Sequence, residues 1–161
     1  TLTRSSAASD VYKRQEAALL RVLHLKQRTV DKGLLLLGAR ADVFATALDL
    51  VEPEVKERVL SSWPGHVTWV LPNPGYSDLV TGGRNTVACR VPDHVQARQL
   101  ADKFGGAIVS TSLNRAGQAP ILNYADACAV FGNEVDCVLA GQTAGALGPS
   151  KILQADGKTL R

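Results

Sequence analysis

The sequence predicts a single α/β domain built on a twisted mixed β-sheet flanked by helices. Short apolar runs of strand length alternate with segments of helical periodicity along the chain. The 161 residues, 45% hydrophobic and 20% charged, supply enough apolar material for one core. Because no repeat or low-complexity linker divides the chain, we expect one sheet to hold all the strands and no second domain.

The expected elements follow in order from periodicity and punctuation. Residues 16–27 carry apolar side chains at helical spacing and bring Lys26 and Arg28 to the end of a helix. Residues 34–37 are four leucines between glycines, which predicts a short buried strand. Further helices are expected at 41–50, 53–60, 94–104 and 124–130, and further strands at 67–71, 86–91, 107–110, 135–139 and around Ile152 and Leu160.

Two local features refine these boundaries. Residues 73–85 are rich in Gly and Pro and predict a loop between two strands. Asp93 precedes the expected helix 94–104, and its carboxylate can accept from the free N–H groups of the first turn. Asp93 is therefore the expected N-cap.

The first fifteen residues differ in character from the rest. The segment DVYKRQ, residues 10–15, is what the string GAT GTG TAT AAG AGA CAG encodes, and this string resembles a transposase adapter used in preparing sequencing libraries. We expect residues 1–15 to be a non-native leader and residues 16–161 to be the domain. The alternative is a genuine disordered tail rich in Ser and Ala.

Composition and charge narrow the functional classes. The leader accounts for +2 of the formal net charge of +3, so the expected domain carries only +1, a weak footprint for a surface that binds nucleic acid. Cys89, Cys128 and Cys137 form no C-x-x-C or Cys/His pattern, so we expect neither a disulfide framework nor a metal site, and we predict a reducing cytoplasm. The longest apolar run is too short to cross a bilayer, and no membrane partner is expected.

Basic residues gather where the first helix ends. Lys26, Arg28 and Lys32 lie within the segment LKQRTVDKG, and cations held at a loop can neutralise a triphosphate. Lys26 and Arg28 would then act electrostatically as a phosphate clamp. The competing interpretation is a solvated helix end, where cations favour the C-terminal dipole.

Two further segments place polar groups at strand ends. Alternation on the strand 86–91 sends Thr86, Ala88 and Arg90 to one face, where the guanidinium presents a fork that matches carboxylate or phosphate. An internal ion pair would satisfy Arg90 equally well. In STSLNRAGQAP, Ser112 and Asn114 can donate to phosphate or ribose oxygens, although an ordinary turn has the same composition.

These segments, with WPGHVTWVLP and GPSKIL, resemble in order the YrdC/TsaC family of threonylcarbamoyl-AMP synthases. The resemblance runs from about residue 16 to residue 161 and implies a YrdC-like fold. It implies an ATP-binding set and a threonine-binding set. The first contains Lys26, Arg28, Lys32, Thr86, Ser110, Ser112, Asn114 and Arg161, and the second contains Thr68, Arg90 and Ser150.

The resemblance also implies an activity and its partners. L-threonine, bicarbonate and ATP would give threonylcarbamoyl-AMP and pyrophosphate, with Mg²⁺ on the phosphates and with no protein nucleophile. The product would feed threonylcarbamoyl modification of adenosine in tRNA, through downstream tRNA-modification proteins. No Walker P-loop, G-x-S-x-G or H-E-x-x-H motif is present to suggest other chemistry.

The chain departs from the family pattern in three places. Its PGHVT and PSK stand where PGPVT and PST are usual, and Leu113 stands where Ala is usual between Ser112 and Asn114. The family's leading strands and its T-[DE]-[TA]-V-Y-G-L-G motif are also expected to be missing, so the chain as given is expected to have little activity. Two alternatives stay open, a non-catalytic double-stranded RNA or tRNA-binding module and the carbamoyl-transfer domain of a larger maturation protein.

Overall fold

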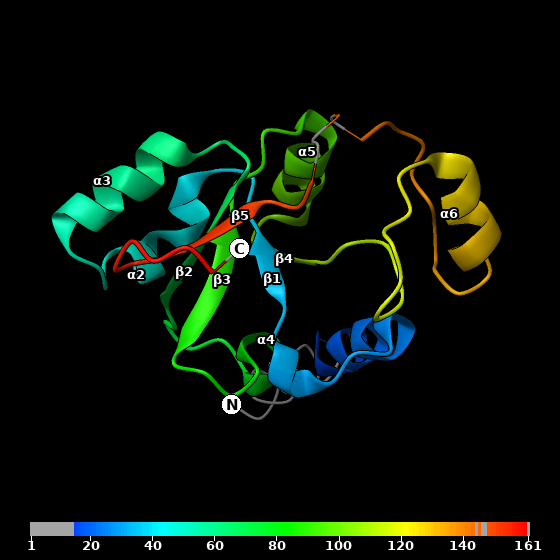
Figure 1. The fold of residues 1–161 in the computed structure, drawn as a ribbon, viewed down its shortest axis with the longest axis horizontal. Coiled ribbons are helices and arrows are strands. Elements are labelled where there is room, and N and C mark those ends of the chain that lie inside the picture. The colour runs from blue at the N-terminus through cyan, green and yellow to red at the C-terminus, as the bar shows by residue number, and fades with distance from the viewer. Residues whose placement is uncertain (1–14, 144, 146–147, 161) are drawn as a thin grey trace, which may run out of the picture.

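A five-stranded mixed sheet forms the centre of the molecule (Figure 1). The computed structural model describes residues 15–143, 145 and 148–160. The strand order is β4-β1-β3-β2-β5, with parallel β1/β3 and β2/β5 pairs and antiparallel β1/β4 and β2/β3 pairs. The strands are β1 (Leu35–Leu37), β2 (Val67–Pro72), β3 (Thr86–Arg90), β4 (Ile108–Ser110) and β5 (Lys151–Gln154). The predicted mixed α/β architecture is confirmed.

Helices join the strands along the chain. A helix over residues 15–26 leads into the short 3-10 helix η1 (Val30–Lys32). The other helices are η2 (Ala41–Phe44), α2 (Ala45–Leu48), α3 (Pro53–Ser62), α4 (Asp78–Thr81), α5 (Val95–Phe104) and α6 (Tyr124–Phe131). In Figure 1 α2 and α3 lie to one side of the sheet, and the helix 15–26 and α6 lie to the other. Within the described residues, no helix is long and apolar enough to cross a membrane.

The hydrophobic core lies between α2, α3 and one face of the sheet. Leu71, Val87 and Cys89 point into it and are buried together with Phe44 and Val59. Burial of such side chains contributes about 1.5 to 3 kcal/mol each to folding. The two buried tryptophans keep their indole N–H groups paired, since Trp63 donates to the Val67 carbonyl and Trp69 donates to Ser62 Oγ. Both indole N–H groups are therefore hydrogen-bonded although the rings are buried in the core.

Several element predictions need correction. The loop predicted over 73–85 contains α4, because Ser77 and Gly82 provide a start and a left-handed stop for one helical turn (φ +68° at Gly82). The helix predicted over 41–50 divides into η2 and α2. The cap of α5 is His94, whose Nδ1 accepts from the Ala97 N–H at 3.3 Å, while Asp93 contacts Arg98 at 3.4 Å instead.

The strand predicted over 135–139 is also wrong. The segment has the alternation of a strand but pairs with none in the described structure. The helix 15–26 holds it instead, since Arg21 donates to the Asp136 carboxylate at 2.8 Å and to the backbone carbonyl of the preceding Glu134 at 2.9 Å. At the chain end, β5 confirms the strand expected at Ile152, whereas the region of Leu160 contributes an isolated bridge between Leu153 and Thr159.

The three cysteines are free and differ in accessibility, which gives a prediction. Burial raises the pKa of the Cys89 thiol to about 12, whereas Cys137 is exposed and Cys128 is partly buried. Because the thiolate is the reactive form, we expect a disulfide reagent at pH 8 to label Cys137 first, Cys128 more slowly and Cys89 only after denaturation. Mass spectrometry of timed samples would check the order, and early labelling of Cys89 would contradict this packing.

Candidate functional site

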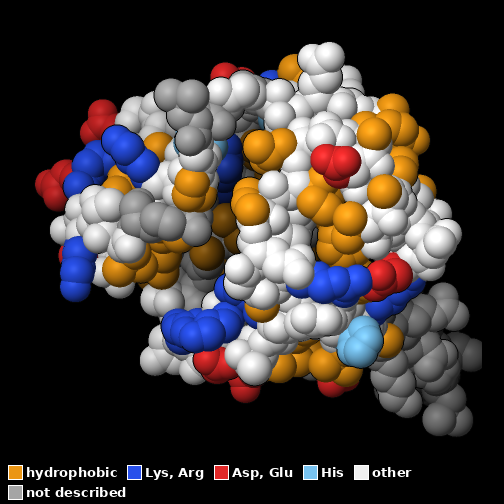
Figure 2. Space-filling view, turned by 45° about the vertical axis from the view of Figure 1, so that its right-hand side comes forward, with side chains coloured by type: hydrophobic (Ala, Val, Ile, Leu, Met, Phe, Trp, Pro, Cys, Tyr) orange, Lys and Arg blue, Asp and Glu red, His pale blue; other side chains and the backbone are white. Residues whose placement is uncertain are grey.

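One face of the sheet is left half-open opposite the core. Successive residues of β1 and β3 alternate between buried and half-buried, so Leu35, Ala88 and Arg90 share the half-open face. The register places Ser110 beside Leu35, and Leu35 beside Ala88. The predicted alternation of β3 is thus confirmed. Figure 2 shows a hollow in this side of the molecule, with Lys and Arg side chains within it and along its lower edge.

Lys26 lies at one end of this face and binds the loop that follows β4. Its ammonium donates to the carbonyls of Ser112 and Asn114 and to Asn114 Oδ1. Ser112 Oγ donates to the same Oδ1 at 2.7 Å, and the amide of Asn114 donates to the Gln118 carbonyl at 2.6 Å. We call Lys26, Ser112 and Asn114 the Lys26 cluster. Three residues predicted for one site from distant segments are therefore in contact.

The environment of Lys26 is unusual for a lysine. Its side chain is buried, and burial lowers the pKa of the ammonium, with the nearby Arg28 cation lowering it further. An ammonium has three N–H donors, and all three point to this loop. Lys26 therefore organises the loop 112–114 directly. A phosphate would contact its nitrogen only by replacing one of these acceptors.

Arg28 and Lys32 shape the turn beside this cluster. Arg28 donates to the carbonyls of Lys32 and Gly33 at 3.2 and 3.1 Å, while Lys32 is exposed and 3.9 Å from Asp31. The turn packs closely on α4, since a Cβ at Gly82 would lie 2.7 Å from the Asp31 carbonyl oxygen. Gly82 therefore adopts a left-handed backbone conformation and, having no side chain, leaves room for the turn to pack against α4.

Arg90 lies at the other end of β3, against the turn before β2. Its Nε donates to the Gly65 carbonyl at 2.9 Å, and its Nη2 is 3.0 Å from His66 Nδ1. No carboxylate pairs with Arg90 among the described residues, which does not support the alternative of an internal ion pair. Burial lowers the pKa of the guanidinium, which still carries its charge at neutral pH. Arg90 is thus a half-buried cation without an anionic partner in the described structure.

Thr68 and Ser150 meet beside this turn. Their hydroxyls lie 2.9 Å apart, and both side chains are buried at the parallel pairing of β2 with β5. In the antiparallel pairing of β2 with β3, Trp69 lies opposite Cys89. Thr68 and Arg90 are the next residues along the two strands at this end. Residues from three distant segments predicted to bind one ligand therefore gather at this end of the sheet.

The remaining predicted residues are spread along the face. Thr86 begins β3, four residues before Arg90 and therefore about 13 Å away at the usual rise of a strand. Ser110 ends β4, two residues before the Lys26 cluster. Arg161 lies outside the described residues. The face thus has two polar ends, the Lys26 cluster and the Arg90 end. Thr86 at the start of β3 and Ser110 at the end of β4 lie away from Arg90.

A pocket of about 320 Å³ lies next to the Lys26 cluster. Its lining includes Arg28, Thr29 and Arg115, of which only Arg28 was among the predicted site residues. Arg115 donates to the Leu25 carbonyl at 3.2 Å and to Glu134 at 2.7 Å, and its guanidinium lies 5.1 Å from the centre of the Phe131 ring. The only sequence signal that Arg115 would line this pocket was its position directly after Asn114.

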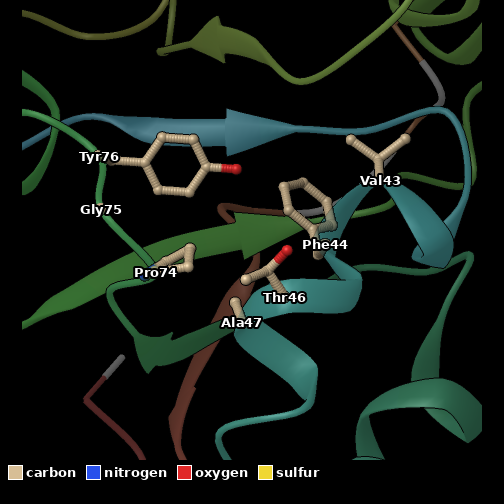
Figure 3. Close-up of a pocket in the computed structure, with 7 residues that line it drawn as sticks. All are labelled: Val43, Phe44, Thr46, Ala47, Pro74, Gly75 and Tyr76. Carbon is tan, nitrogen blue, oxygen red and sulfur yellow. The ribbon is translucent and has the colours of Figure 1, made fainter.

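A second pocket, of about 250 Å³, lies beside α2 (Figure 3). Val43, Phe44, Thr46 and Ala47 line it from η2 and α2, and Tyr76 lines it from the loop after β2. None of the predicted site residues lines it. It borders the packed side of the sheet, so we assign the polar face, and not this pocket, as the candidate site.

Comparison with known proteins identifies the family. The family model named for Sua5, YciO and YrdC, and described as telomere recombination, matches residues 10–161. This chain belongs to the Sua5/YciO/YrdC family. The resemblance to YrdC/TsaC proteins predicted from the motifs is confirmed, and so is the fold that it implies.

Curated members of the Sua5/YciO/YrdC family match most of the chain. The threonylcarbamoyl-AMP synthase of Hahella chejuensis is 40% identical over 148 residues, which is 91% of this chain and 80% of that protein. The threonylcarbamoyl-AMP synthase of Chromohalobacter salexigens is 42% identical over 149 residues, with the same two shares.

Solved structures of the family agree with the fold. Sua5 of P. abyssi complexed with L-threonine superposes with a TM-score of 0.77 at 26% identity, over 86% of this chain. The H234A/Y235A variant of P. abyssi Sua5 gives a TM-score of 0.82 at 25% identity, over 87% of this chain. This chain spans 43% of the length of that variant and 41% of the threonine complex, so it corresponds to less than half of those proteins.

Proposed function

We propose that this protein is a threonylcarbamoyl-AMP synthase, which makes threonylcarbamoyl-AMP and pyrophosphate from L-threonine, bicarbonate and ATP. One observation carries the proposal. A single sheet face joins the Lys26 cluster at one end to Arg90 at the other, a half-buried cation that has no anionic partner among the described residues. An anion-binding loop and a carboxylate-binding arginine are what a nucleotide and an amino acid need. The two curated synthases described above support the same activity.

The reaction requires positioning more than covalent catalysis. The amine of threonine takes up CO₂ supplied by bicarbonate, and it loses a proton to give a carbamate. A carbamate oxygen then forms a bond to the α-phosphorus of ATP, and the bond from that phosphorus to the bridging oxygen breaks and releases pyrophosphate. No protein nucleophile takes part, so holding the carbamate in line with the α-phosphate supplies most of the rate increase.

We assign the Lys26 end of the face to ATP. Lys26 holds the loop of Ser112 and Asn114, and Arg28 and Lys32 add positive charge beside it. Such fixed charges and dipoles stabilise the negative charge that grows on the leaving pyrophosphate. Thr86, Ser110 and Arg161 complete the proposed ATP set. Lys26 and Arg28 act here electrostatically and not as nucleophiles.

We assign the Arg90 end to threonine. Within the described structure Nη1 of Arg90 makes no hydrogen bond, so a terminal edge of the guanidinium can receive a carboxylate. The hydroxyls of Thr68 and Ser150 form the floor of this subsite. The structure of P. abyssi Sua5 complexed with L-threonine, whose fold this chain shares at 26% identity, supports threonine as a ligand of this fold.

We propose that Mg²⁺ reaches the site on the phosphates of ATP. No group of three or more His, Cys, Asp or Glu side chains in the described residues is arranged to hold a metal ion. This fits a cation whose main ligands are phosphate oxygens and water. When bound, Mg²⁺ neutralises phosphate charge, while the residues of the chain orient the two substrates.

We also propose that the product serves tRNA modification. Threonylcarbamoyl-AMP is a mixed anhydride, and its adenylate is a good leaving group for transfer to a nucleophilic amine. An adenosine amine in tRNA, presented by downstream modification proteins, would be the acceptor. ATP and tRNA are both abundant in the cytoplasm, which is the location that we propose.

An omission experiment tests the activity. We expect pyrophosphate release with ATP, threonine and bicarbonate together, and a loss of at least about tenfold when either threonine or bicarbonate is left out, because only the carbamate attacks the α-phosphate. Coupled phosphate detection after pyrophosphatase would measure it. Equal release without threonine would overturn the proposal, and RNA binding that falls steeply with salt but without ATP turnover would favour the RNA-binding module.

A further inference from the structure

A turn of the chain holds one edge of the Arg90 guanidinium in place. Gly65 and His66 precede β2, and they accept from Nε and Nη2 of Arg90 at 2.9 and 3.0 Å. The turn is itself fixed on both sides, because the Gly65 N–H donates to the Val91 carbonyl at 2.9 Å and the His66 carbonyl accepts from the Lys151 N–H at 3.2 Å. It therefore joins β3 to the start of β5.

The partners of His66 determine its tautomer. A guanidinium can only donate, so Nδ1 of His66 must accept from Arg90 and carries no proton. In the neutral ring the proton then lies on Nε2, which donates to the Gly148 carbonyl at 3.0 Å. One imidazole thus connects Arg90 to the segment that leads to Ser150. Arg90 is in the proposed threonine set, and so is Ser150, which follows Gly148 by two residues.

We propose that His66 is a positioning residue for threonine binding, which aims Arg90 and holds the Gly148 segment at the subsite. The geometry leaves Nη1 of Arg90 for the carboxylate while Gly65 and His66 fix the plane of the guanidinium. Without this support, Arg90 would have to lose rotamer freedom when threonine binds, which weakens affinity. This inference rests on the proposed function.

Variants of His66 provide the test. His66→Ala removes both side-chain bonds, of which only the one to Arg90 touches the group proposed to bind threonine. We expect the KM for threonine to rise about three- to tenfold while the KM for ATP stays within about twofold, because that contact is a single exposed hydrogen bond. His66→Asn places an amide oxygen near the position of Nδ1, so it should restore most of the affinity for threonine. Initial rates of pyrophosphate release give both constants.

His94→Ala is the matched control. His94 also approaches a carbonyl, that of Gln142 at 3.0 Å, and it caps α5. Its loss should lower the melting temperature through the lost cap while leaving the KM for threonine unchanged. A rise in the KM for threonine equal to that of His66→Ala would overturn the proposal, because general loosening would then explain both.

An NMR measurement and the variant Arg90→Ala distinguish an error in the role of His66 from an error in the proposed threonine site. The ¹⁵N resonances of the His66 ring should show the Nε2–H tautomer in the wild type, and in Arg90→Ala the Nδ1 resonance should shift because its donor is lost, while the Gly148 carbonyl still holds the Nε2 proton. If Arg90→Ala binds threonine as the wild type does, the proposed threonine site itself is wrong. If Arg90→Ala loses threonine but His66→Ala keeps the wild-type KM, or if His66→Asn is no better than His66→Ala, only the role of His66 is overturned.

Discussion

Replacing Arg90 with Lys should raise the KM for threonine about a hundredfold while the KM for ATP changes little. Lysine keeps the positive charge but loses the planar fork, and a charged pair of this kind is worth about 2 to 3 kcal/mol. The variant also loses at least one of the two contacts that Arg90 makes with Gly65 and His66. Initial rates at varied threonine and saturating ATP would measure the effect.

Arg58→Lys is the control for this prediction. Arg58 also donates to a backbone carbonyl, that of Ala155 at 3.1 Å, and it lies 5.9 Å from the Trp69 ring. We expect its replacement to leave both KM values unchanged. If Arg90→Lys binds threonine normally but melts far below the wild type, Arg90 is structural, and the threonine site must be placed elsewhere.

The sequence predicted an element correctly where its apolar residues followed a single clear period. The alternation on 86–91 predicted correctly which residues of β3 face the core, because burial on one face leaves only one register. The segment 135–139 shows the limit of this signal. Its pattern suits a strand, but Arg21 holds Asp136 and Glu134 against the helix 15–26, and only the tertiary structure reveals this. The helix α4 was missed for the opposite reason, because four residues are too few to show a helical period.

The candidate site was predictable as a set of residue types but not as a set of contacts. The motifs gave Lys26, Ser112 and Asn114 separately, and the structure joins them in one cluster. The sequence could not show that the ammonium of Lys26 is fully occupied by this loop. Nor could it show that His66 accepts from Arg90, because residues 24 positions apart meet only through the pairing of β2 with β3.

Replacing Lys26 with Met should be the most damaging single change at the ATP end. It leaves the carbonyls of Ser112 and Asn114 without their buried donor, while Asn114 Oδ1 keeps only the Ser112 hydroxyl. We expect the free energy of unfolding to fall by about 2 to 3 kcal/mol, because unsatisfied acceptors keep their desolvation cost. We also expect kcat/KM for ATP to fall about a hundredfold or more, because the loop and its charge are lost together. Urea denaturation and initial rates would measure the two effects.

Two matched variants make this prediction specific. Lys56→Met removes a lysine that pairs with Asp49 at 2.6 Å on an exposed surface, and such a pair is worth about 0 to 1 kcal/mol, so stability and rate should hardly change. Asn114→Ala removes one acceptor and keeps the ammonium, so its loss of kcat/KM should be smaller than that of Lys26→Met. If Lys26→Met unfolds at the same urea concentration as Lys56→Met and uses ATP equally well, then neither the loop nor the nucleotide depends on this ammonium, and the ATP subsite must lie on another part of the face.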